Sequence, residues 1–150
     1  MRLLAGALIA TLVCGPAFAQ TGAQTNDTIT CGSFKASAKR DGQLTSWTVA
    51  GNTEKGALRS PPRFECIENS ALVVEIAFTG GHGTVAVYFP DGSDLTYSRA
   101  QVERRNNRWI LPIQAKAHVP PALRTAFDYH CKMDMPLSPI PPGSRGECVP

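Results

Sequence analysis

The stretch ALVVEIAFTGGHGTVAVYFPDGSDLTYSRAQVERRNNRWILPI, residues 71–113, decides the predicted fold. Its short apolar runs alternate with Gly, Asp and Asn, which is typical of strands joined by tight turns. In its first two runs, residues 71–78 and 84–89, every second side chain is apolar, so each strand is expected to bury one face. The pattern predicts an antiparallel meander with a single core. The residues expected to be buried together in that core are Val74, Ile76, Val85, Val87 and Trp109.

The residues that precede this stretch predict further strands. We expect strands over residues 28–34, 44–50 and 64–67, in which apolar side chains alternate with polar ones. In the second of these strands, Trp47 and Val49 should point inward. A polar loop over residues 35–42 and a loop over residues 51–63, which ends in two prolines, should separate them.

The segment that follows the meander is compatible with two structures. Leu123, Ala126 and Phe127 fit one face of a short helix that begins at a proline, whereas Phe127 and Tyr129 fit a strand equally well. The fold class is therefore mainly β: a small antiparallel β-sandwich or barrel with a central meander, room for one short helix, and two disulfides.

The first residues have the pattern of a secretory signal peptide. Arg2 precedes an apolar run, and Ala17-Phe18-Ala19 forms a cleavage site. The run is too short to span a bilayer, which needs about 20 apolar residues, so we expect no transmembrane segment in the mature chain. We predict a leader over residues 1–19, a mobile tail over 20–27, a β domain over 28–135 and a Pro-rich tail over 136–150, and hence a periplasmic or secreted protein.

Cysteine usage agrees with export. Removal of the leader with Cys14 leaves an even number of cysteines, which is typical of disulfides in an oxidising compartment. No two of them have the short spacing of structural zinc sites, so we expect neither metal nor cofactor. Pairing of sequence neighbours is preferred, and the Pro-rich tail would then be tied back. The predicted pairs are Cys31 with Cys66 and Cys131 with Cys148.

The charge of the chain is small, but its arginines are clustered. The leader-free chain has 14 basic and 12 acidic residues, which is too balanced to indicate nucleic-acid binding. Arginines surround the polar turn at Asn106-Asn107, and they either bind an anionic group or keep a sheet edge soluble. The candidate partner-binding residues are Arg99, Arg104, Arg105 and Arg108, together with His82 in the neighbouring Gly-rich hairpin tip.

No strong catalytic motif occurs in the sequence. There is no nucleophile elbow, zinc-protease helix, phosphate loop or calcium loop. Asp128 and His130 are two residues apart, so on a strand they would share a face and could act as a dyad. We therefore expect an exported, non-enzymatic binding or inhibitory module, such as a virulence accessory protein, that binds a protein or an anionic envelope ligand. The alternative is a small periplasmic hydrolase or metal-dependent enzyme that uses Asp128 and His130.

The segment from Phe64-Glu65-Cys66 to Leu95 resembles small bacterial lysozyme inhibitors of the C-type class. That resemblance implies a small β-barrel and an inhibitory loop that contains serine and glycine. In this sequence Gly92-Ser93 and Tyr97-Ser98 lie in the corresponding region without reproducing the inhibitory motif.

Overall fold

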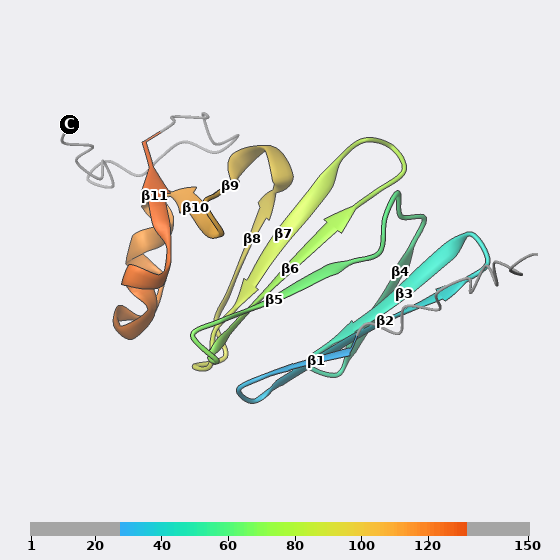
Figure 1. Cartoon of the computed structure of the whole chain (residues 1–150), viewed down its shortest axis with the longest axis horizontal. Helices are drawn as coiled ribbons and strands as arrows, with labels where there is room; N and C mark the ends of the chain where they lie inside the picture. Colours follow the sequence, from blue (N-terminus) through green and yellow to red (C-terminus); the bar gives the residue numbers. More distant parts are fainter. Residues whose placement is uncertain (1–27, 132–150) are drawn as a thin grey trace, which may run out of the picture.

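The computed structural model describes residues 28–131 as three β-sheets (Figure 1). The N-terminal sheet is a meander of four strands: β1 (Thr28–Cys31), β2 (Phe34–Asp41), β3 (Leu44–Val49) and β4 (Asn52–Gly56). The central sheet is a second meander: β5 (Arg63–Ile67), β6 (Ala71–Ala77), β7 (Gly83–Tyr88) and β8 (Asp94–Ser98). The described part of the chain thus has the predicted mainly β class, but its sheets do not close into a barrel.

The third sheet is small, and it lies on the side of the central sheet that is opposite the N-terminal sheet (Figure 1). It contains β9 (Glu103–Arg105), β10 (Arg108–Pro112) and β11 (Asp128–His130), and β11 runs parallel to β10. Together with three 3-10 helices, this sheet forms what we call the C-terminal layer. The helices are η1 (Arg99–Gln101), η2 (Ile113–Ala117) and η3 (Pro121–Ala126). The segment that was compatible with either a helix or a strand forms both in turn, the short helix η3 and then the strand β11. The predicted meander ends at Ser98, because η1 turns the chain away from the central sheet.

The core is double, which corrects the prediction of a single one. On β6, Leu72, Val74 and Ile76 face the N-terminal sheet, whereas Val73 faces the C-terminal layer. Val73 pairs with Val87 on β7, and cross-strand partners share a sheet face. All five predicted core residues are buried, but Val74 and Ile76 belong to one core and Val85, Val87 and Trp109 belong to the other. The error arose because β6 is buried on both faces.

The N-terminal sheet contains two strands that were predicted to be loops. In β2, Ala36 and Ala38 are buried, but their small side chains give a weak periodic signal among the charged residues of the strand. In β4 the first four residues are exposed, so the strand lacks an apolar face. The strand β3 was predicted, and its Trp47 and Val49 point into the core as expected.

A disulfide joins the N-terminal and central sheets. Cys31 at the end of β1 is bonded to Cys66 of β5, as predicted, and Cys31 is fully buried. The second predicted pair includes Cys148, which lies outside the described residues, as do the leader and both tails. Among the described residues, no helix has the length and apolar character needed to cross a membrane.

Candidate functional site

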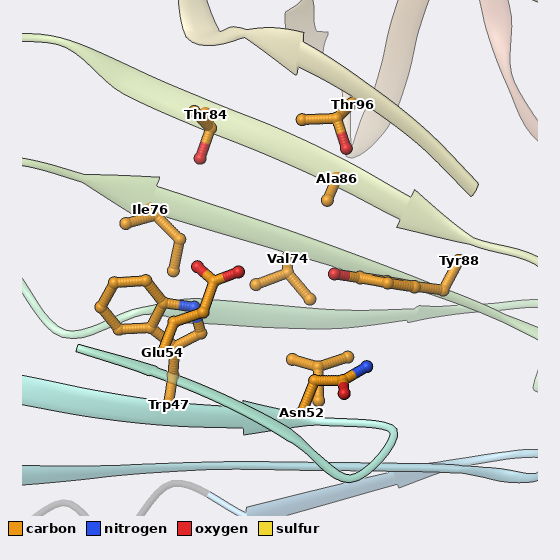
Figure 2. A pocket seen from close by; sticks show the side chains of 10 residues that line it. Trp47, Asn52, Glu54, Val74, Ile76, Thr84, Ala86, Tyr88 and Thr96 are labelled. Carbon is orange, nitrogen blue, oxygen red and sulfur yellow. The ribbon is translucent and has the colours of Figure 1, made fainter. Parts of the chain in front are cut away.

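A cleft lies between the N-terminal sheet and the central sheet (Figure 2). Its volume is about 110 Å³, smaller than the ~150 Å³ cavity known to accept a benzene molecule. It is therefore too small for a whole drug-sized ligand and suits a slim group, such as one unbranched side chain.

One wall of the cleft comes from a pair of neighbouring strands in the N-terminal sheet. Trp47 of β3 is the cross-strand partner of Glu54 on β4, and Val49 is the partner of Asn52. Partners in an antiparallel pair project from the same face, so both pairs line the cleft. Trp47 and Val49 are buried while Asn52 and Glu54 are exposed, which gives this wall an apolar base and a polar rim.

The opposite wall comes from three strands of the central sheet. Val74 on β6, Ala86 on β7 and Thr96 on β8 form one row of cross-strand neighbours. Ile76 and Thr84 form a second row. Buried Val74 and Ile76 form the base, whereas Ala86 on β7 is half-buried. A small side chain at position 86 leaves room for the cleft.

Tyr88 of β7 closes one end of the cleft. In Figure 2 its hydroxyl and the Glu54 carboxylate both point toward the space beside Val74. Its ring also contacts Phe34, with 6.2 Å between the ring centroids, which limits its movement. At the other end Trp47 packs edge-on against Phe78, with their ring centroids 6.3 Å apart.

The cleft has an acidic electrostatic character. Among the described residues, its lining contains one carboxylate, that of Glu54, and no lysine or arginine. Asp94 is the cross-strand partner of Tyr88 and adds a second negative charge beside the cleft. Burial raises the pKa of the Tyr88 hydroxyl, and the charges of Asp94 and Glu54 raise that pKa further. Tyr88 thus remains a neutral hydrogen-bond donor at physiological pH.

The arginines that were predicted to bind a partner lie on the opposite side of the central sheet. Arg99 donates a hydrogen bond to Glu75 over 2.6 Å and lies 5.8 Å from the Trp109 ring centroid. Arg104 donates two hydrogen bonds to Glu65, at 3.0 and 3.1 Å. Both arginines therefore stabilise contacts between the central sheet and the C-terminal layer.

The other two arginines also have carboxylate partners. Arg108 donates to Asp128 over 3.1 Å and to the Thr125 carbonyl over 2.7 Å. Arg105 donates to Glu103 over 3.2 Å, and its side chain is 72% exposed. Of these four arginines, Arg105 is the one most accessible to a partner.

The histidines are dispersed. His82 is exposed in the β6–β7 hairpin and stacks on Phe78, with 4.7 Å between the rings. Asp128 pairs with Arg108, whereas the His130 ring is hydrogen-bonded to the Gln101 carbonyl over 3.0 Å. Among the described residues, no three His, Cys, Asp or Glu side chains gather as metal ligands do.

The cleft was not predicted from the sequence, although the inward position of Trp47 was. Comparison with known proteins adds no information on function, because no family model, curated protein or solved structure matches this chain.

Proposed function

We propose that this chain is an exported, non-enzymatic binding module and that its ligand occupies the cleft between the N-terminal and central sheets. The observation that carries the proposal is the composition of this cleft. Two aromatic side chains, two threonine hydroxyls, an amide and a carboxylate line an open space above an apolar base. A few polar groups above an apolar surface are typical of sites that bind small groups.

The rigidity of the two sheets that form the cleft is typical of a preorganised binding site. The two sheets that form the cleft share a buried core, and the Cys31–Cys66 bond links them. The side chains of the lining project from regular strands, which hold their positions better than loops do. A ligand that enters the cleft therefore meets groups that are already arranged, which lowers the entropy cost of binding.

The size of the cleft favours a partner that inserts one group and leaves the remainder outside. This agrees with a module that binds or inhibits a larger molecule in the periplasm or outside the cell. Binding of an anionic partner by the arginines has less support, because each of the four arginines is already paired with a carboxylate of this chain. The alternative hydrolase also has less support, because Asp128 and His130 have separate partners.

A fragment screen by nuclear magnetic resonance tests the proposal. The two tryptophans report on different sites, since Trp47 lines the cleft and Trp109 lies in the other core. Neutral, cationic and anionic fragments should include some that shift the Trp47 indole N–H signal and leave the Trp109 signal in place. If no fragment of any charge shifts the Trp47 signal, the cleft is not a ligand site.

A further inference from the structure

The charge and shape of the cleft narrow the class of ligand, provided that the cleft is the ligand site proposed above. The Glu54 carboxylate at the rim accepts hydrogen bonds and donates none, so it favours a bound group that donates hydrogen bonds or carries positive charge. In the part of the chain that the structure describes, no lysine or arginine of the lining competes for this carboxylate. Glu54 belongs to β4, an edge strand of its sheet, and no ion pair to it occurs among the described residues.

The aromatic side chains of the cleft also favour a positively charged ligand. The ring faces of Trp and Tyr carry negative electrostatic potential and attract cations. Trp47 is the cross-strand partner of Glu54, so an indole ring at the base of the cleft lies next to a carboxylate at its rim. Asp94 reinforces the negative potential from the β8 side, next to Tyr88.

The remaining lining groups fit an alkyl chain that ends in a cation. Val74, Ile76 and Ala86 provide an apolar surface for methylene groups. The hydroxyls of Thr84, Tyr88 and Thr96 can accept hydrogen bonds from a donor with several N–H groups. An anion would instead be repelled by Glu54 and Asp94, and a neutral polyol would leave the carboxylate without a countercharge.

We infer that the cleft binds an alkylammonium or guanidinium group, with its alkyl chain on Val74 and Ala86 and its cationic end paired with Glu54. This group is carried by lysine and arginine side chains and also by free amines. The volume of about 110 Å³ suits one such chain.

The test is a titration of the purified protein with three probes of similar size and different charge: n-butylammonium, 1-butanol and butyrate. The Trp47 indole signal is the readout, and the Trp109 indole signal is the internal reference. The n-butylammonium ion should bind more tightly than either other probe, and its binding should weaken as sodium chloride is added. Glu54→Gln should weaken its binding by roughly fivefold, the upper range for an exposed ion pair. Glu68→Gln is the matched control, because Glu68 is exposed in a turn and is not a lining residue, and it should leave the affinity unchanged.

Two capped peptides identify the source of the cation. If Gly-Lys-Gly binds more tightly than n-butylammonium and Gly-norleucine-Gly does not bind, the cation comes from a polypeptide; equal binding of the lysine peptide and n-butylammonium assigns it to a free amine. Equal or tighter binding of 1-butanol or butyrate at Trp47 would overturn the cationic class and keep the cleft as a site. Absence of any shift at Trp47 would overturn both the class and the proposed function.

Discussion

Arg104 on β9 donates two hydrogen bonds to Glu65 on β5, at 3.0 and 3.1 Å, and so ties the C-terminal layer to the edge of the central sheet. Trp109 donates a third hydrogen bond to the same carboxylate over 3.0 Å. Hydrogen bonding to the Glu65 carboxylate raises the pKa of the Arg104 guanidinium. In the sequence Arg104 lies beside the polar turn at Asn106-Asn107, and in the structure its side chain lies over the Trp109 ring.

Arg104→Glu should therefore destabilise the fold, because it would place a second carboxylate next to Glu65. The matched variant is Arg105→Glu on the same strand, whose side chain is 72% exposed and whose reversal should have little effect. Thermal unfolding followed by circular dichroism would compare them. We expect the unfolding midpoint to fall clearly for Arg104→Glu and to stay within about 2 °C for Arg105→Glu. Equal midpoints would mean that the pair with Glu65 does not support the fold.

Ile76 is the sharpest test of the strand register. It is 4% exposed and packs in the core between the two larger sheets, so Ile76→Ala should lower the free energy of unfolding by about 2–5 kcal/mol. Leu44→Ala is the control, since Leu44 is 49% exposed and its truncation should cost less than about 0.5 kcal/mol. Urea unfolding would measure both. A small loss for Ile76→Ala would show that this side chain is not in the core.

The disulfide between Cys31 and Cys66 should contribute a large share of the stability. The bond closes a loop with a sequence separation of 35, for which the chain-entropy model gives roughly 4 kcal/mol. A variant with both Cys31→Ala and Cys66→Ala should therefore unfold at a much lower urea concentration than the oxidised wild type. Unfolding of the reduced wild type should resemble that of the reduced double variant, because reduction also opens any other disulfide in both proteins. Unchanged stability in the double variant would show that the bond is dispensable.

The raised pKa values of the three tyrosines predict that the protein loses stability at alkaline pH. Burial raises the pKa of Tyr88, Tyr97 and Tyr129 above the ordinary value of 10.0. Above that pH the unfolded chain has released these protons while the folded chain retains them, so the free energy of unfolding falls as pH rises. Tyr88→Phe should flatten this fall above pH 10 and leave its shape below pH 9 unchanged. Urea unfolding across this pH range would check the prediction, and an identical alkaline slope in Tyr88→Phe would contradict it.

The sequence predicted the strands that have a strong apolar period of two and missed β2 and β4, in which that period is weak or absent. β3, β5, β6 and β7 have apolar side chains at alternate positions or throughout. β4 has none, because it is an exposed edge strand whose position depends on pairing with β3. Its membership in the sheet is a tertiary effect that local sequence patterns do not report.

The cleft was missed for a related reason. Glu54 and Asn52 appear in the sequence as loop residues, and Thr84, Ala86 and Thr96 appear as the polar face of a solvated sheet. Only the packing of the two sheets, joined at Cys31 and Cys66, brings these groups together. The arginine cluster was conspicuous in the sequence, but the carboxylates that pair with Arg99 and Arg104 are distant along the chain.

The most direct test of the cleft as the ligand site is the affinity of Ala86→Phe for the tightest-binding fragment of the screen. Ala86 lines the cleft, so a phenyl ring at this position should occupy the space that the ligand needs. Ala122→Phe adds the same ring at an exposed position in η3 and serves as the control, and urea unfolding would verify that both variants fold. We predict that Ala86→Phe binds the fragment at least about tenfold more weakly, a loss of ~1.4 kcal/mol, and that Ala122→Phe binds like the wild type. Wild-type affinity in a folded Ala86→Phe protein would contradict the assignment of the cleft as the binding site.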